Sequence, residues 1–299
     1  MSIRTVAILS PGEMGHAVGQ LLREHELTVV TCLAGRSART RALAAKAGIT
    51  DVPTMEELVA QADVILSITV SEAAPALCQQ VADAIRATRA SVLFAECNAI
   101  APQTARRLEP IITEAGGRFV DTSIIGGPPR GGRSPRFYAS GPHAGEFESA
   151  FGGRKFGLDV RNIGPEIGQA SGIKMCYAAM TKGSAALFAQ LLLAAERLGL
   201  LEPLLENIRR SPMTTYQRME SWIPEAPTNA RRWVSEMQEI EATFGHLGMT
   251  PYLFQGVADM YRFMGGTPLG EEKPETLDRT RTFQETIRTL AAYLQPEAD

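Results

Sequence analysis

The chain has 299 residues and a formal net charge of −3, with 44% hydrophobic and 21% charged residues. These values are typical of a soluble globular protein with room for two domains, each with its own apolar core. A net charge this close to zero gives no broad attraction to nucleic acid or to an anionic membrane, and no apolar run reaches the roughly 18 residues of a membrane span. We therefore expect a cytoplasmic protein with a small-molecule substrate, no nucleic acid and no membrane.

The cysteines and histidines exclude two kinds of site. The four cysteines have no CxxC spacing and lie in apolar segments, so we expect free thiols in a reducing cytoplasm. The four histidines are not paired at metal-ligand spacing, and no metal is predicted.

The first half of the chain alternates short β-rich segments with helical ones. Strands are expected at residues 4–9, 27–32, 62–69, 90–96, 117–124 and 136–141. Helical periodicity lies between them, at 13–25, 38–48, 54–61, 71–88 and 101–116. This alternation predicts βαβ units and an α/β Rossmann domain with a doubly wound, mostly parallel sheet.

A glycine-rich segment, NIGPEIGQASG at 162–172, ends the alternation, and strand signals nearly vanish after it. Residues 173–200 form a helical segment that is apolar almost all round and is therefore expected to be buried. Further helices are expected at about 202–222, 229–247, 250–264 and 274–294. We divide the chain into an NADP-binding Rossmann domain, 1–165, and an all-helical substrate and dimerisation domain, 166–299.

The segment ILSPGEMGHAVG (8–19) follows the first strand and opens the first helix, which is the position of a dinucleotide-binding loop. Gly12 stands where the backbone approaches a pyrophosphate, and Gly15 stands where the helix packs on the sheet. Ser10 replaces the first glycine of the GxGxxG pattern and can still form the turn with a negative φ. A plain strand–helix turn is the alternative. We expect cofactor contacts from Ser10, Pro11, Gly12, Glu13, Met14 and Gly15.

The segment after the second strand indicates which cofactor is bound. In NAD-binding proteins an acidic residue about 20 positions past the loop holds the ribose 2′-hydroxyl, but TCLAGRSARTR (31–41) has no acid. It carries Arg36, Ser37, Arg39 and Arg41, and guanidinium and hydroxyl groups suit a 2′-phosphate. We predict NADP(H), with a solvated basic helix start as the alternative.

Lys174 lies in the first turn of the long apolar helix, where a buried charge without a role would be costly. A lysine can move the hydroxyl proton of a hydride-transfer reaction if its pKa falls from about 10.4 toward 7–8. Burial beside an oxidised nicotinamide favours that shift. A lysine that extends its ammonium group into solvent is the alternative.

Lys174 shares one helical face with the residues at 177, 178, 181 and 185. The alanines of this face leave space for a substrate, and Tyr177 and Thr181 offer hydroxyl groups. Lys182, at the rim, can meet an anionic group. Packing for Tyr177 and a solvated cation for Lys182 remain as alternatives.

Asn98 follows the C-terminal end of a strand, where an open α/β sheet binds its ligands. We expect it to contact the substrate and the nicotinamide ribose, with an Asx-turn as the alternative. Arg130, Arg133 and Arg136 lie in a Gly/Pro-rich segment and offer contacts to a carboxylate or phosphate, although a solvated loop is favoured.

Four segments resemble motifs of the β-hydroxyacid dehydrogenase and 6-phosphogluconate dehydrogenase superfamily. GEMGHAVG (12–19) is similar to its glycine loop, ECNAIAP (96–102) to its D-x-S-T-x-x-P segment, and DTSIIGG (121–127) to its D-A-P-V-S-G-G segment. GQASGIKMCYAAMTKG (168–183) is similar to G-x-x-G-x-x-K-x-x-N-N, which puts Lys174 on the family's catalytic lysine. Residues 230–256 resemble the distinct all-helical C-terminal domain of one subgroup.

The resemblance implies a nicotinamide-dependent dehydrogenase that forms a homodimer through its helical domain. Ile125 stands where the family has a substrate-contacting serine, and Tyr177 and Ala178 replace paired asparagines. Thr181 stands where sugar-acid members carry an acidic proton donor, so decarboxylation remains open.

The implied catalytic residues are Lys174, Asn98 and Thr181. The nucleotide site extends to Ile68, Thr69 and Val70. The implied substrate contacts are Ser123, Ile125, Gly126, Tyr177, Lys182, Trp233 and Met237. Trp233 and Met237 belong to an apolar helical stripe, for which a place in the core or in a subunit interface is favoured over the substrate pocket.

These observations predict an NADP-dependent oxidoreductase that acts on a small polar hydroxy compound, a hydroxy acid, with Lys174 as general acid and base. Imine reduction on the same scaffold is an alternative, because a site with Ile125 and without the paired asparagines is less suited to binding a substrate carboxylate. A non-catalytic NADP(H)-binding module is a third, and the retained Lys174 argues against it. A short-chain dehydrogenase is disfavoured because Thr181, not lysine, stands four residues after Tyr177.

Overall fold

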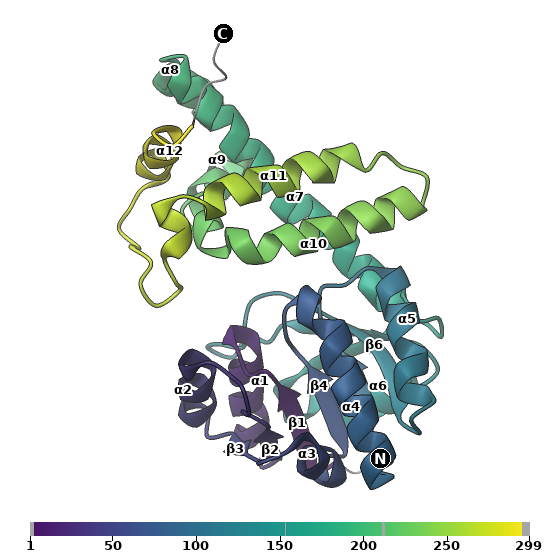
Figure 1. The fold of residues 1–299 in the computed structure, drawn as a ribbon. Helices are drawn as coiled ribbons and strands as arrows, with labels where there is room; N and C mark the ends of the chain where they lie inside the picture. The colour runs from purple at the N-terminus through teal and green to yellow at the C-terminus, as the bar shows by residue number, and fades with distance from the viewer. Residues whose placement is uncertain (1–2, 153, 211–212, 295–299) are drawn as a thin grey trace. The chain divides into compact units, whose positions relative to one another are not determined.

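A computed structural model describes residues 3–152, 154–210 and 213–294 (Figure 1). The chain divides into two compact units, Met1–Met175 and Cys176–Asp299. The boundary expected between residues 165 and 166 lies shortly before this division. The first unit contains the sheet, and the described part of the second is helical.

The sheet of the first unit has the strand order β3-β2-β1-β4-β5-β6-β7-β8. Its strands are β1 (Thr5–Leu9), β2 (Thr28–Thr31), β3 (Thr50–Asp51), β4 (Val64–Ser67), β5 (Leu93–Glu96), β6 (Arg118–Ile125), β7 (Arg136–Ser140) and β8 (Asp159–Asn162). Neighbouring strands are parallel except β6 and β7. The doubly wound, mostly parallel Rossmann sheet is therefore confirmed.

Helices cover both faces of this sheet. One core layer contains side chains of α1 (Glu13–Glu24), α2 (Ala38–Lys46) and α6 (Ala144–Phe151). The opposite layer contains side chains of α3 (Met55–Gln61), α4 (Ala74–Thr88) and α5 (Pro102–Thr113). Successive strand residues alternate between the layers, as Phe94 and Ala95 do. The central strands are thus buried on both sides, which explains their continuous apolar runs.

Among the described strands and α-helices, two strands and one helix lie outside the predicted elements. β3 consists of two exposed residues that pair with Val30 and Thr31 of β2. β8 has the polar sequence DVRN and pairs with β7. Neither carries an apolar run, so their backbone pairing left no sequence signal. The short helix α6 was also not predicted, although its buried phenylalanines pack in the first core layer.

The long helix α7 (Gln169–Arg197) begins in the first unit. It is followed by α8 (Leu201–Arg210), α9 (Met213–Trp222), α10 (Ala226–His246), α11 (Tyr252–Gly265), η3 (Pro268–Glu271) and α12 (Phe283–Ala291). In Figure 1 α10 and α11 run alongside each other, and the rings of Phe244 and Phe254 lie 5.2 Å apart. The helical C-terminal part is thus confirmed.

The expectation that the long helix is buried all round is wrong for a single chain. Met180 and Leu187 of α7 are 51% and 59% exposed. Within the described ranges, no helix combines the length and the apolar character needed to cross a membrane.

Four buried polar side chains form a row across the sheet, which we call the polar row: Ser67, Glu96, Asp121 and Ser140. The strand register pairs Ser67 with Glu96, Glu96 with Asp121, and Asp121 with Ser140. None of the four has any exposed surface. Because the parallel strands β4 and β5 end at this row, it lies beneath the edge of the sheet where Rossmann proteins bind their ligands.

Asp121 holds the start of α7. Its Oδ2 accepts hydrogen bonds from the Ser140 hydroxyl at 3.0 Å and from the amides of Gly168 and Ser171 at 2.8 and 3.1 Å. Its Oδ1 accepts the Ser171 hydroxyl at 2.5 Å, and the Ser140 Oγ accepts the Ala170 amide at 3.0 Å. A carboxylate in this place satisfies unpaired helix N–H groups and interacts favourably with the helix dipole. The beginning of α7 is therefore fixed to β6 and β7.

The replacement Asp121→Asn is expected to lower the free energy of unfolding by about 2–4 kcal/mol, because an amide nitrogen cannot accept the hydrogen bonds that one carboxylate oxygen accepts now. Urea denaturation followed by circular dichroism measures this loss. The control Asp83→Asn removes an exposed carboxylate of α4 and is expected to change stability by less than about 1 kcal/mol. A loss in Asp121→Asn no larger than that of the control would contradict the capping role.

Candidate functional site

The predicted cofactor loop connects β1 to α1. Ser10 has a φ of +60°, so the expected negative φ is wrong, and a serine adopts the left-handed conformation that usually favours glycine. The Gly12 amide donates to the Ser10 carbonyl oxygen at 2.6 Å. The Nδ1 atom of His16 lies 2.7 Å from the Gly12 carbonyl oxygen. The turn is thus formed without the first glycine of the pattern.

The shape of this loop fits a diphosphate. A Cβ atom at Gly12 would meet one atom within 4 Å among the described residues, the Ser10 carbonyl oxygen at 3.8 Å, so the outside of the loop is open. A Cβ atom at Gly15 would lie 3.2 Å from the Ile8 side chain, because α1 packs closely on the sheet there. Gly12 is the N-cap residue and provides no side-chain cap. The first-turn N–H groups of α1 can therefore bind an anion.

The loop between β2 and α2 carries the predicted 2′-phosphate contacts. Ser37 is the N-cap of α2, and its Oγ accepts the Thr40 amide at 3.2 Å. The Arg36 amide donates to the Leu33 carbonyl oxygen at 3.0 Å, which closes a turn. Arg36 is half-buried, and Ser37 and Arg39 are exposed. The guanidinium group of Arg36 and the hydroxyl of Ser37 therefore lie on the loop after β2, and the guanidinium group of Arg39 lies in the first turn of α2.

Asp51 is an acid in this region that the sequence reasoning missed. It ends β3, and its Oδ1 accepts the Leu33 amide at 2.8 Å. Arg41 donates to the Leu33 carbonyl oxygen at 2.6 Å, and its Nη1 lies 3.9 Å from Asp51 Oδ2. Asp51 and Arg41 thus brace the turn after β2. The missing signal was β3 itself, which brings Asp51 beside the end of β2.

Asn98 connects the ends of β4 and β5. Its Oδ1 accepts the Thr69 amide at 2.5 Å, and its Nδ2 donates to Ser67 Oγ at 3.0 Å and to Glu96 Oε1. Its backbone amide also donates to Glu96 Oε1, at 3.0 Å, and the residue is 3% exposed. This geometry does not support the predicted catalytic contact, because the carboxamide is already bonded inside the sheet. Asn98 fixes the loop that follows β4, with Ile68 buried, Thr69 half-buried and Val70 exposed.

Lys174 lies in the second turn of α7, one turn later than expected, because α7 begins at Gln169. The residue is half-buried, and its Nζ donates to the Ile124 carbonyl oxygen at 2.7 Å. Ile124 is the second-to-last residue of β6. The ammonium group is therefore held at the carboxyl end of a central strand.

Three of the seven predicted substrate contacts lie at the end of β6, and two of these three are accessible to solvent. Ile125 is half-buried, and Gly126 is exposed with a φ of +121°, which requires glycine. Ser123 has no exposed surface, and its Oγ has no hydrogen-bond partner among the described residues. A substrate contact by Ser123 is therefore not supported, because its side chain points into the protein.

Lys182 is paired inside the helical unit. Its ammonium group bonds to the Glu236 carboxylate, and the two side chains are 14% and 8% exposed. Its Nζ lies 5.5 Å from the centre of the half-buried Trp233 ring. Burial lowers the pKa of Lys182, whereas the charge of Glu236 raises it. Binding of an anionic substrate by Lys182 is therefore not supported. Nor is a contact by Met237, which has no exposed surface.

The remaining predicted residues of α7 differ in exposure. Tyr177 is 45% exposed. The Thr181 hydroxyl donates to the Tyr177 carbonyl oxygen at 3.1 Å and can still accept a hydrogen bond. Ala178 and Ala185 are each 2% exposed, so they do not leave open space as expected. The hydroxyl-bearing residues remain candidates for substrate contacts.

The arginine-rich segment after β6 is a tight hairpin. The backbones of Arg130 and Arg133 exchange two hydrogen bonds of 3.0 Å, and Gly131 and Gly132 have φ angles of +55° and +77°, as in a type I′ turn. Arg136 belongs to β7, where its Nε bonds to Asp159 Oδ2 at 3.2 Å. An anion contact by Arg136 is thus not supported.

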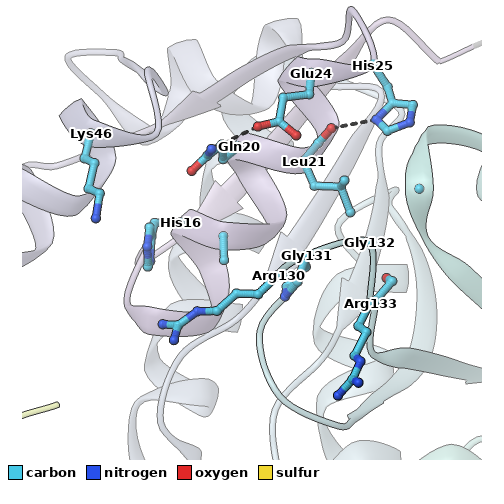
Figure 2. A pocket seen from close by; sticks show the side chains of 14 residues that line it. His16, Gln20, Leu21, Glu24, His25, Lys46, Arg130, Gly131, Gly132 and Arg133 are labelled. Carbon is cyan, nitrogen blue, oxygen red and sulfur yellow. Dashed lines mark hydrogen bonds between the residues drawn. The ribbon is translucent and has the colours of Figure 1, made fainter.

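The hairpin faces the outer side of α1 across a groove of about 740 Å³. Figure 2 shows this groove with His16, Gln20 and Glu24 on α1 and with Arg130 and Arg133 from the hairpin. Its lining includes no residue of the predicted nucleotide site. In the described part of the chain, no group of three or more His, Cys, Asp or Glu residues is placed to hold a metal ion.

Comparison with known families divides the chain in a similar way. The NAD binding domain of 6-phosphogluconate dehydrogenase matches residues 5–150, and a domain of unknown function (DUF1932) matches residues 195–264. An uncharacterised 28.5 kDa protein of Methanothermus fervidus is 25% identical over 258 residues, which cover 86% of this chain and 97% of that protein.

Solved structures of similar fold include dehydrogenases and reductases. A conserved protein described as similar in structure to 3-hydroxyacid dehydrogenases has 28% identity and a TM-score of 0.65, covering 87% of this chain and 96% of its own. The 3-hydroxyisobutyrate dehydrogenase of Mycobacterium tuberculosis has 18% identity and a TM-score of 0.67, covering 97% and 99%. The imine reductase of Myxococcus stipitatus, in complex with NADP+, has 19% identity and a TM-score of 0.57, covering 96% and 99%.

The replacement Lys182→Met is expected to lower the free energy of unfolding by about 3–5 kcal/mol, because it leaves the Glu236 charge buried and unpaired. Adding Glu236→Leu is expected to recover most of this loss, since the buried charge is then also removed. Chemical denaturation of both variants measures the two effects.

The matched control is Arg210→Met, which breaks an exposed ion pair with Glu206 and is expected to cost less than about 1 kcal/mol. A Lys182→Met loss as small as the control's, or a double variant less stable than the single one, would contradict a buried ion pair.

Proposed function

We propose that this chain, whose residues 5–150 match the NAD binding domain of 6-phosphogluconate dehydrogenase, is an NADP(H)-dependent oxidoreductase acting on the hydroxyl carbon of a small polar hydroxy acid. Lys174 is the general acid and base in this proposal. The observation that carries it is the hydrogen bond from Lys174 Nζ to the Ile124 carbonyl oxygen, at 2.7 Å. This bond keeps an amine at the carboxyl edge of the sheet, where α/β proteins bind their ligands.

A bound nicotinamide supplies or accepts the hydride. The chain's own residues hold the dinucleotide through the open loop at Gly12 and the N-terminus of α1. Lys174 donates a proton to the substrate oxygen in reduction and accepts it in oxidation. Ile124 fixes the direction of the ammonium group, and Asp121 fixes the helix that carries it. Ile125 and Gly126 line the same strand end and shape the substrate side.

The loop after β2 supports NADP(H) over NAD(H). Arg36 and Arg39 offer guanidinium groups to a 2′-phosphate, and the Ser37 hydroxyl can donate a hydrogen bond while its oxygen caps α2. Asp51 is the nearby acid, but it ends β3 and its Oδ1 accepts the Leu33 amide. The segment 31–41, which follows β2, has no acid, whereas NAD-binding proteins carry one there to hold the ribose 2′-hydroxyl.

Imine reduction is the second candidate, and Ile125 favours it. An apolar side chain stands at the strand end, beside the carbonyl group that binds Lys174, where a carboxylate substrate needs a polar partner. Turnover of hydroxy acids with NADP+ at alkaline pH, compared with turnover of cyclic imines with NADPH, separates the two reactions.

We also propose that the protein is a homodimer formed through its helical unit, in a reducing cytoplasm. Large apolar side chains are exposed on the single chain, among them Leu187, Leu198, Leu247, Tyr252 and Leu253. A second copy that covered them would remove apolar surface from water. The four cysteines are free thiols, which supports a reducing compartment.

The replacement Lys174→Ala is expected to lower turnover by about 10²–10⁴-fold and to leave the Kd of NADPH nearly unchanged, because a general acid and base acts on the substrate proton and not on the nucleotide. Steady-state kinetics and fluorescence titration measure the two quantities. Lys155→Ala, which removes an exposed lysine from the same unit, is the control. Unchanged turnover in Lys174→Ala would remove the proposed role.

The replacement Arg36→Ala is expected to raise the Kd of NADPH about tenfold or more, because a charge-assisted hydrogen bond to the 2′-phosphate is lost. The Kd of NADH is expected to change little. Arg86→Ala, an exposed arginine on α4, controls for net charge. An equal loss of affinity for both nucleotides would show that Arg36 does not contact the 2′-phosphate.

A further inference from the structure

Glu96 is a buried carboxyl group with no part in the reaction proposed above. It is the last residue of β5, belongs to the polar row and has no exposed surface. Burial raises its pKa to about 8, although hydrogen bonds from Asn98 and Ser67 lower it. Its Oε2 atom has no hydrogen-bond partner among the described residues. The carboxyl group is therefore half ionised near pH 8.

Two hydrogen-bonded steps connect Glu96 to the proposed cofactor site. Glu96 Oε1 accepts both the backbone amide and the Nδ2 group of Asn98. Asn98 Oδ1 accepts the Thr69 amide at 2.5 Å, at the start of the loop after β4. The carboxyl ends of β4 and β5 are where an open α/β sheet meets its ligand. Glu96 is therefore connected by hydrogen bonds to Asn98 and Thr69, two residues of the predicted cofactor site.

We propose that Glu96 is a positioning residue which, through Asn98 and Thr69, makes the site bind the oxidised nicotinamide more tightly when its carboxyl group is ionised than when it is neutral. The inference rests on the proposed function. Oxidised and reduced dinucleotides differ by one positive charge, which lies on the nicotinamide ring. A carboxylate enclosed in the sheet acts on that charge with less screening than one in water.

The other titratable groups around Glu96 can be separated from it. On β6, the charge of Asp121 raises the pKa of Glu96. Burial raises the pKa of Cys78, on α4, to about 12 and that of Cys97 well above its ordinary value. Neither thiol therefore loses a proton near pH 8. Asp121 is kept in a Glu96 variant, so its contribution appears unchanged there.

The test is the pH dependence of two dissociation constants. The Kd values of NADP+ and NADPH are measured by calorimetry for the intact protein, from about pH 7 to about pH 9.5, on either side of the pKa of Glu96. The ratio of the NADP+ value to the NADPH value is expected to fall about three- to thirtyfold as pH rises through 8 in the wild type. In Glu96→Gln the ratio is expected to stay constant. Both nucleotides carry the 2′-phosphate, so its titration cancels in the ratio.

A matched variant tests whether position matters. Asp63 accepts the amides of Arg4 and Thr5 at 2.7 and 2.9 Å, at the opposite edge of the sheet. Asp63→Asn changes the net charge by the same amount as Glu96→Gln and is expected to keep the wild-type pH dependence. A flat ratio in Asp63→Asn would overturn the inference, because it would make the effect one of overall charge.

Proton release provides a second measurement, which does not need a Glu96 variant. Because NADP+ binding favours the ionised carboxyl group, it is expected to release protons near pH 8, whereas NADPH binding is not. Calorimetry in two buffers of different ionisation enthalpy detects this release, even if Glu96→Gln does not fold. The same measurement on Lys174→Ala excludes a proton released by Lys174 beside the oxidised ring, and loss of the release in that variant would overturn the inference.

Two results would overturn the inference alone: an equal pH dependence in the wild type and Glu96→Gln, or equal proton release by both nucleotides. Failure of both nucleotides to bind at millimolar concentration would overturn the proposed function, and this inference with it.

Discussion

The burial of two carboxyl groups in the polar row is the constraint on which the fold and the candidate site both depend. A buried carboxyl group is costly unless hydrogen bonds satisfy it. The donors of Asp121 come from β7 and the start of α7, and those of Glu96 come from Asn98 and Ser67. These donors also bring the helix that carries Lys174, and the loop after β4, to one edge of the sheet. Satisfying the two carboxyl groups therefore assembles the site.

The core strands could be predicted from the sequence because their physical environment is uniform. β1, β4 and β5 are buried on both faces, so each has an apolar run bounded by turn residues. β3 and β8 lack such runs, and their extended backbone depends on a neighbouring strand that no local pattern reveals. For α7 the sequence predicted the element but not the burial of its side chains. Apolar periodicity predicted a helix correctly, but it does not tell whether a chain covers its own apolar side chains.

At the candidate site, local patterns predicted where residues lie on their strand, loop or helix. Whether a side chain is available to a ligand depends on partners that are distant in the sequence. The spacing of Gly12 and Gly15 predicted the backbone that is open to solvent at Gly12 and the close packing of α1 on the sheet at Gly15. Residue type and helical face placed Lys182 at the rim of the predicted substrate face, where it could meet an anion, but its partner Glu236 stands 54 positions away. The bonds of Asn98 and the burial of Ser123 likewise depend on segments that come together only in the folded sheet.

The turn at Ser10 and Pro11 has a consequence for how a nucleotide is received. The proline ring fixes its own φ, the Gly12 amide bonds to the Ser10 carbonyl group, and the His16 ring lies against the Gly12 carbonyl group. Few torsions of this turn remain free to change. A diphosphate would meet a shape that already exists, so association would lose little conformational entropy of the loop. A flexible glycine turn would lose more conformational entropy on binding, so the rigid turn favours a higher affinity for the same contacts.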